Sequence, residues 1–281
     1  MKNGFVLAAL LFSGRALELG AALKALGAFA SFCLLASAVY VLNDVVDRAS
    51  DRAHPTKRFR PVASGEVSTP AAVIGGSALL LLATWIAFSV SPGVGQIALL
   101  YVGLNVAYSL VLKRVVLLDV FSIAAFFVLR LLAGAAAIDV VPSVWLLLCG
   151  GLLALYLGFA KRRHEIVLLG DEAMDHRAVL SEYSVAFLDQ LSGVILAVTI
   201  VCYIMYTFES ETARLVGGHR LTYSSVFVLY GVFRYLHLAH SRADGNPADT
   251  LLSDRSLLIT VILWAAYCAT VLYGLPPGGM R

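Results

Sequence analysis

Three aspartates lie close together where a long apolar run meets a polar segment. Asp44, Asp47 and Asp51 are spaced three and four residues apart, so they share one face if the helix continues past Asn43. Carboxylates in this arrangement suit Mg²⁺, which takes oxygen ligands and commonly binds through a few carboxylates together with substrate phosphates. The spacing therefore predicts a divalent cation site, in which Asn43 adds a carbonyl ligand or orients a carboxylate.

Basic residues follow these acids directly. Pro55 and Pro61 interrupt the helix, and the stretch that contains them offers hydrogen-bond donors to a phosphate. The alternative is a solvated loop whose charges only fix the membrane topology. The order of the residues, with the acids followed by the bases, favours a site for a Mg²⁺–diphosphate. The basic side chains of this stretch are His54, Lys57, Arg58 and Arg60.

A second charged segment follows the sixth apolar run. Asp171 and Asp175 are four residues apart and share one face if that segment is helical. Such pairs of acids are also common on exposed helices. The evidence for a site is that this second segment is predicted to lie on the same side of the membrane as the first. Basic charge is supplied again, and Glu165 either orients a base or joins the metal shell. The basic residues here are Lys161, Arg162 and Arg163.

Further polar residues lie between these two segments. Tyr108 and Lys113 fall at the end of the fourth apolar run, and Asp119 and Arg130 fall within the fifth. An ionisable side chain at membrane depth is costly and is a functional candidate by default. We expect Asp119 to face the site. Arg130 lies deeper, and it either has a functional role or forms a structural pair or extends its charge toward the interface.

The elements that position these residues are membrane helices. The 281 residues are 60% hydrophobic and only 14% charged, with a mean hydropathy of +0.85, against about 25% charged in soluble domains. Continuous apolar runs rather than alternating ones predict an all-α, polytopic bundle. About nine transmembrane helices are expected, the first of them short for a full span. The runs fall near residues 4–13, 21–42, 70–90, 96–112, 116–138, 144–160, 184–207, 222–240 and 255–274.

Basic residues are concentrated in alternate loops. The loops at 43–69, 113–115, 161–183 and 241–255 are rich in Lys and Arg, which by the positive-inside rule places them and the predicted site in the cytoplasm. The N-terminus is then inside and the C-terminus outside. We expect one domain over 1–281, no cleavable signal peptide and four cysteines buried as small apolar residues without disulfides.

The motifs resemble those of a known family. NDVVDRASDRAHPTKRFRP, then YSLVLKRVVLLD, then KRRHEI with GDEAMDHRAVLSEYS are similar to the UbiA superfamily of intramembrane prenyltransferases. Within it they are most like the decaprenyl-phosphate phosphoribosyltransferase branch. Members of that branch usually carry an Arg-Pro and aromatic stretch before the Lys2-Asn3 pair, so here either the start is trimmed or the first helix is short.

The resemblance implies roles for matching positions. Asp44, Asp47 and Asp51 would hold Mg²⁺ at the donor diphosphate, and Asp171 and Asp175 would form a second acidic site toward the metal or the ribose. We expect Asp175 to join the metal ligands. The residues that would contact phosphates of donor or acceptor are Lys57, Arg58, Arg60, Lys113, Lys161 and Arg162.

The implied reaction is Mg²⁺-dependent transfer of 5-phosphoribosyl from phosphoribosyl pyrophosphate to a polyprenyl phosphate, in the bacterial plasma membrane, for envelope polysaccharide precursors. The oligomeric state stays open, and no nucleic-acid partner is expected. The nearest alternative is a prenyltransferase that moves a polyprenyl group from its diphosphate to an aromatic acceptor. A transporter is less favoured, because the acids gather at one interface rather than near the midplane.

Overall fold

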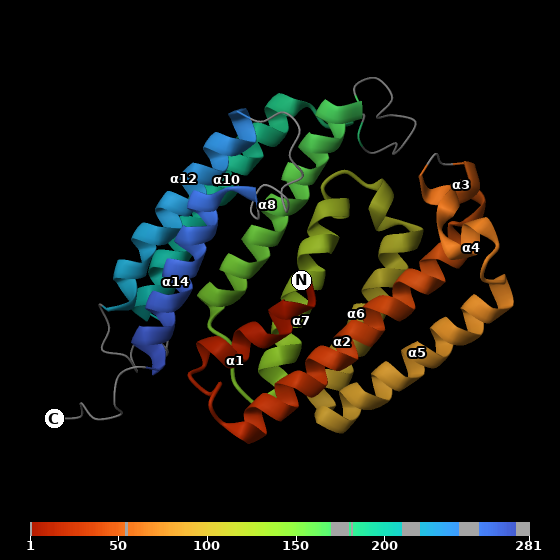
Figure 1. The fold of residues 1–281 in the computed structure, drawn as a ribbon, viewed down its shortest axis with the longest axis horizontal. Coiled ribbons are helices and arrows are strands. Elements are labelled where there is room, and N and C mark those ends of the chain that lie inside the picture. The colour runs from red at the N-terminus through yellow and green to blue at the C-terminus, as the bar shows by residue number, and fades with distance from the viewer. Residues whose placement is uncertain are drawn as a thin grey trace. The chain divides into compact units, whose positions relative to one another are not determined.

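A computed structural model describes residues 2–53, 56–169, 180, 182–209, 220–241 and 253–273. Within these ranges every regular element is helical (Figure 1). Seven helices are long and apolar enough to cross a membrane. They are α2 (Leu19–Val46), α5 (Thr69–Val90), α6 (Pro92–Leu110), α7 (Leu118–Ala137), α8 (Val144–Leu169), α10 (Val185–Glu209) and α14 (Arg255–Tyr273).

Each of the nine predicted apolar runs coincides with a helical segment in the described part of the chain. The two that are shorter than a full span are the pair η1 (Lys2–Leu7) and α1 (Ala8–Phe12), as predicted, and α12 (Ser225–Ser241) of 17 residues, preceded by η6 (Leu221–Ser224). The all-α membrane bundle is therefore confirmed. All four cysteines are free thiols; Cys202 and Cys268 are buried as predicted, whereas Cys33 and Cys149 are only partly buried.

The chain divides into two compact units. One comprises residues 1–11, 15–111 and 129–141, and the other residues 12–14, 112–128 and 142–281. The boundary passes through α7, so both units share one continuous helix. The expectation of a single domain over 1–281 stays a prediction.

Small side chains bring the helices of the first unit close together. Ser31 on α2 donates a hydrogen bond to the Ala83 carbonyl of α5 at 2.8 Å. A Cβ at Gly76 would lie 3.1 Å from Leu42, so α5 approaches α2 where glycine leaves room. Close backbone approach through small residues is how membrane helices gain packing and hydrogen bonds without a hydrophobic driving force.

The N-terminal segment belongs to this unit and packs on α7. At Gly134 any Cβ would overlap the backbone carbonyl of Val6, so only glycine fits there. One turn earlier, the buried Arg130 donates to Asn3 Oδ1 and to the Tyr101 hydroxyl, both at 2.8 Å, and lies over the Tyr101 ring. The structural role considered for Arg130 is the one observed.

In the second unit α8 packs along α10, and α12 lies beside α14 (Figure 1). Its core contains Tyr156 and Phe159 of α8 with Leu188 and Ile195 of α10. Large apolar side chains such as Val201 and Ile262 remain more than half exposed, as expected for surfaces that contact lipid.

Candidate active site

The acidic segment lies at the end of α2. Helix α2 runs on past Asn43 to Val46, as the shared-face argument required, and Asp47 is its C-terminal cap. Helix α3 (Arg48–Ala53) follows at once, and the Asp51 amide donates to the Asp47 carbonyl at 2.9 Å. Helical hydrogen bonding thus continues through the junction.

The chain then folds back on α3 in two short turns. Helix η2 (Lys57–Phe59) leads to α4 (Pro61–Ser64), where Pro61 occupies the first turn and Gly65 ends the helix at a φ of +92°. These positions suit the two residues, because proline has no amide hydrogen to lose at a helix start and glycine tolerates positive φ. Arg52 Nε donates to the Ala63 carbonyl at 2.9 Å and ties α4 to α3. Figure 1 shows α3 and α4 together beside the end of α2.

This fold-back places Arg60 between two of the aspartates. One nitrogen, Nη1, donates to Asp44 Oδ1 at 2.8 Å and to Asp51 Oδ2 at 2.9 Å. The side chain of Asp51 is 5% exposed and that of Asp44 is 26% exposed, whereas Arg60 is 41% exposed. Two of the three predicted acids, Asp44 and Asp51, and one predicted base therefore form a single ionic cluster, in which the more deeply buried carboxylate is neutralised by an accessible guanidinium.

Other predicted residues of this unit lie around the cluster. Asn43 Oδ1 accepts a hydrogen bond from Ser109 of α6 at 2.9 Å, which fixes the orientation of the Asn43 side-chain amide. The predicted residue Tyr108 directly precedes Ser109 on this helix. Lys57 and Arg58 are exposed on η2, and the Arg58 guanidinium lies 4.8 Å from the centre of the Phe59 ring. Their roles toward a ligand stay predictions.

The residues present suit a divalent cation in chemistry. Asp44 and Asp51 place carboxylate oxygens within reach of one common nitrogen, and hard oxygen ligands are what Mg²⁺ prefers. Among the described residues, no three His, Cys, Asp or Glu side chains are grouped as metal ligands. His54, Asp171 and Asp175 lie outside the described residues.

A second ionic network lies in the other unit. Arg162 of α8 donates to Asp119 Oδ2 at 2.8 Å and to Glu165 Oε2 at 2.6 Å. The side chains of Arg162 and Asp119 are 3% and 0% exposed. The predicted association of Arg162 with Glu165 is therefore present, and Asp119 joins it. A role of these three residues in substrate binding stays a prediction. Lys161 and Lys113, on α8 and on η3 (Leu112–Arg114), belong to the same unit.

Tyr183 completes this network, and sequence reasoning missed it. Its hydroxyl donates to Asp119 Oδ1 at 2.9 Å and accepts from the Leu117 amide at 2.6 Å. Leu117 has a φ of +67°, an uncommon conformation for a branched side chain. Burial raises the pKa of Tyr183 to about 12; the Leu117 amide lowers it in part, and the adjacent Asp119 carboxylate raises it. The hydroxyl therefore stays protonated and holds Leu117 where α7 begins.

Two further ion pairs in this unit were not predicted. Arg163 of α8 donates to Asp189 of α10 at 2.5 Å. Arg234 of α12 binds Asp254, whose Oδ1 also accepts from the Leu257 amide in the first turn of α14. Asp254 stands immediately before an apolar run, which is the sequence signal of a helix cap and would have identified it.

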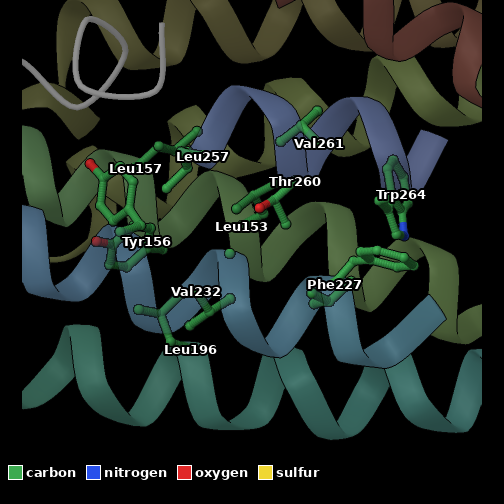
Figure 2. Close-up of a pocket in the computed structure, with 13 residues that line it drawn as sticks. Leu153, Tyr156, Leu157, Leu196, Phe227, Val232, Leu257, Thr260, Val261 and Trp264 are labelled. Carbon is green, nitrogen blue, oxygen red and sulfur yellow. The ribbon is translucent and has the colours of Figure 1, made fainter. Parts of the chain in front are cut away.

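The second unit also contains an apolar pocket of about 250 Å³ (Figure 2). Side chains of α8, α12 and α14 line it, with Leu196 from α10. The polar groups of Thr260 and Trp264 are engaged within the protein, with the Ser256 carbonyl and the Tyr203 hydroxyl respectively. The pocket wall is therefore suited to hydrocarbon.

Comparisons with known proteins agree with this architecture. The sequence profile described as the UbiA prenyltransferase family matches residues 4–253. The chain is 29% identical to decaprenyl-phosphate phosphoribosyltransferase of Mycolicibacterium smegmatis, over 97% of this chain and 89% of that protein. It is 35% identical to nodulation protein NoeC of Azorhizobium caulinodans, over 93% and 86% of the two chains.

Solved structures show the same fold. A UbiA homolog from Archaeoglobus fulgidus bound to DMAPP and Mg²⁺ superposes with a TM-score of 0.65 at 19% identity, over 97% of both chains. A structure of digeranylgeranylglyceryl phosphate synthase gives a TM-score of 0.69 at 17% identity, over 98% of this chain and 93% of that one. The resemblance inferred from the acidic motifs is thus confirmed by profile and fold. This polytopic membrane protein is a transferase that belongs to the UbiA prenyltransferase family.

Proposed function

We propose that the protein transfers 5-phosphoribosyl from phosphoribosyl pyrophosphate to a polyprenyl phosphate and releases diphosphate. The observation that carries this proposal is the cluster of Arg60 with Asp44 and Asp51 at the end of α2, beside the exposed bases of η2. It joins acids suited to a metal with bases suited to phosphate. Relatives named decaprenyl-phosphate phosphoribosyltransferase, similar along nearly the whole chain, support the choice of donor and acceptor.

In the proposed reaction the bond between ribose C1 and the diphosphate breaks, and a bond between C1 and an oxygen of the lipid phosphate forms. Lys57, Arg58 and Arg60 donate hydrogen bonds to phosphate oxygens of the donor. Mg²⁺ bound at the aspartates would supply charge neutralisation for the departing diphosphate. The acceptor phosphate is already an anion at neutral pH, so none of these side chains needs to act as a general base.

Positive charge develops on the ribose as the diphosphate departs. A carboxylate beside C1 stabilises such an oxocarbenium-like centre, as in glycosyl transfer generally. Asp51 is the described residue that suits this role, since burial holds its carboxylate in one orientation. Asp175 is the second candidate by sequence.

The lipid acceptor needs an apolar environment for its chain. The pocket between α8, α12 and α14 in the second unit offers such an environment. The polar groups of Thr260 and Trp264 in its wall form hydrogen bonds within the protein and are therefore not directed at a ligand. The soluble donor would arrive from the cytoplasm, which is the side that the positive-inside rule assigns to the acidic segment.

The test uses purified protein in detergent, Mg²⁺, labelled phosphoribosyl pyrophosphate and a polyprenyl phosphate. We expect label to enter the organic-soluble lipid fraction and EDTA to abolish the transfer. If no label moves, but an aromatic acid is prenylated from a polyprenyl diphosphate, the chain is a prenyltransferase in the narrow sense. That outcome would replace both substrates and leave the family unchanged.

A further inference from the structure

One nitrogen of Arg60 lies between two carboxylates that are expected to bind the metal ion. Nη1 donates to both Asp44 Oδ1 and Asp51 Oδ2, at 2.8 and 2.9 Å. Each hydrogen bond uses a lone pair of a carboxylate oxygen that could otherwise coordinate a cation. The guanidinium and a divalent cation therefore compete for the same oxygens, and their like charges repel one another at this separation.

Arg60 can leave this position without rearrangement of the backbone. Its extended backbone conformation is fixed between η2 and Pro61 of α4, and its amide donates to the Lys57 carbonyl at 2.9 Å. The side chain is 41% exposed, so rotation about its own bonds brings the guanidinium out of the cluster. The buried carboxylate of Asp51, by contrast, stays where it is.

A diphosphate offers Arg60 a better partner than a metal alone does. The planar guanidinium binds phosphate oxygens through two parallel hydrogen bonds, whereas it is simply repelled by a bare cation. When metal and diphosphate arrive together, the carboxylates and the guanidinium of Arg60 therefore each gain a new partner of opposite charge. The carboxylates exchange a guanidinium for the metal, and the guanidinium exchanges carboxylates for phosphate.

We propose that Arg60 is an exchangeable counter-ion that makes the site select the metal–diphosphate complex over the free metal ion. This inference rests on the proposed function for the identity of the donor, but it concerns metal binding and not transfer. Its consequence is positive coupling: diphosphate raises the affinity for the metal because it removes Arg60 from the carboxylates, and the metal raises the affinity for diphosphate by the same factor.

The experiment titrates purified protein with Mn²⁺, a paramagnetic substitute for Mg²⁺, and follows the free ion by electron paramagnetic resonance. Each titration is run with and without inorganic diphosphate, after correction for Mn²⁺–diphosphate formed in solution. The variants are Arg60→Gln and Arg60→Lys. The control is Arg114→Gln, which removes the same charge at an exposed position of η3.

We expect Arg60→Gln to bind Mn²⁺ alone about tenfold more tightly than wild type and to lose most of the gain that diphosphate produces, within the range of ordinary coupling factors. Arg114→Gln should change the affinity for Mn²⁺ alone by much less. Arg60→Lys, which keeps the charge but loses the planar fork, should stay near wild type for Mn²⁺ alone. Equal or weaker binding of Mn²⁺ by Arg60→Gln would overturn the proposal, because Arg60 would then assemble the carboxylates rather than block them.

Thermal unfolding keeps the test decisive if Arg60→Gln is unstable, since loss of the guanidinium leaves the buried Asp51 uncompensated. Mn²⁺ without diphosphate should then raise the melting temperature of Arg60→Gln more than that of wild type, because at one ligand concentration the protein that binds the ligand more tightly is stabilised more. A smaller rise would overturn the proposal. Because no sugar donor or lipid is present, failure of phosphoribosyl transfer and failure of this exchange are separate results.

Discussion

Arg162 and Asp119 form an ion pair that is buried at both ends, with 3% and 0% of the two side chains exposed. A buried charge whose partner is removed is costly, because neither water nor another charge replaces the lost interaction. The pair joins the first turn of α7 to the last turns of α8, so its loss should lower the stability of the second unit.

Asp119→Ala should destabilise the protein by about 3–5 kcal/mol, the usual cost of leaving one member of a buried ion pair without its partner. Replacing both residues, as in Asp119→Leu with Arg162→Met, should cost less than the sum of the two single changes. Unfolding in detergent, followed by circular dichroism, measures both. Glu18→Ala breaks the exposed pair of Glu18 with Arg15 and should change the melting temperature far less. Additive costs would mean that the two buried residues act independently.

Tyr183→Phe should remove a pH dependence of stability. The folded protein holds the pKa of Tyr183 at about 12, above its usual value of 10.0. Between these values the folded state binds the proton and the unfolded state does not, so stability is fully present below about pH 10 and falls as the pH rises toward 12. Melting temperatures of wild type and variant, measured from about pH 8 to pH 11.5, should therefore converge at the alkaline end. A constant difference would show that the hydroxyl is not coupled to folding in this way.

Metal removal and loss of a carboxylate should have the same effect on transfer. Chelation by EDTA should abolish label transfer from phosphoribosyl pyrophosphate, and excess Mg²⁺ should restore it. Asp47→Ala should lower kcat at least a hundredfold while the variant keeps the wild-type circular dichroism, because preorganised charge at the departing group contributes on this scale. Near-normal turnover in Asp47→Ala would exclude Asp47 from the metal ligands.

Lys57→Ala should act on the donor. We expect a higher KM for phosphoribosyl pyrophosphate, by about tenfold for one lost charge-assisted hydrogen bond, with the KM for polyprenyl phosphate unchanged. Steady-state kinetics with each substrate varied in turn separates the two. An effect confined to the lipid acceptor would assign Lys57 to the acceptor phosphate instead.

Gly231→Leu should obstruct the apolar pocket. The nearest atom to a Cβ at this position is Thr260 Cγ2 at 3.9 Å, so the new side chain enters the pocket without a clash at its base. We expect a raised KM for a long polyprenyl phosphate and an unchanged KM for the donor. Gly103→Leu on α6, where a Cβ meets nothing within 4 Å, is the matched control. If both variants behave alike, the pocket does not hold the lipid chain.

The helices could be predicted because each depends on its own residues. Hydropathy located α5 and α14 to within a residue or two, and Ser91 followed by Pro92 marks the start of α6 more accurately than the apolar run, which suggested residue 96. The spacing of Asp44 and Asp51 correctly placed them on a common side, since both depend on continued helical hydrogen bonding through Asp47.

The contacts that organise the two ionic clusters could not be predicted in this way. Arg60 reaches Asp44 only because α4 turns back on α3, and sequence spacing does not fix the direction of that turn. Tyr183 meets Leu117 across 66 residues, and a leucine at positive φ gives no sequence signal, because the surrounding packing imposes this conformation on it. Local patterns specify elements, whereas these pairings depend on tertiary packing.

The contact between Val6 and Gly134 has a consequence for biogenesis. Val6 packs against a glycine more than 120 positions later, so its docking site does not exist until α7 has been synthesised and inserted. The Lys2–Phe12 segment must therefore wait at the membrane while four later spans of the sequence enter it. An N-terminal fusion that delays or anchors this segment would impair assembly of the first unit without altering any residue of the ionic cluster.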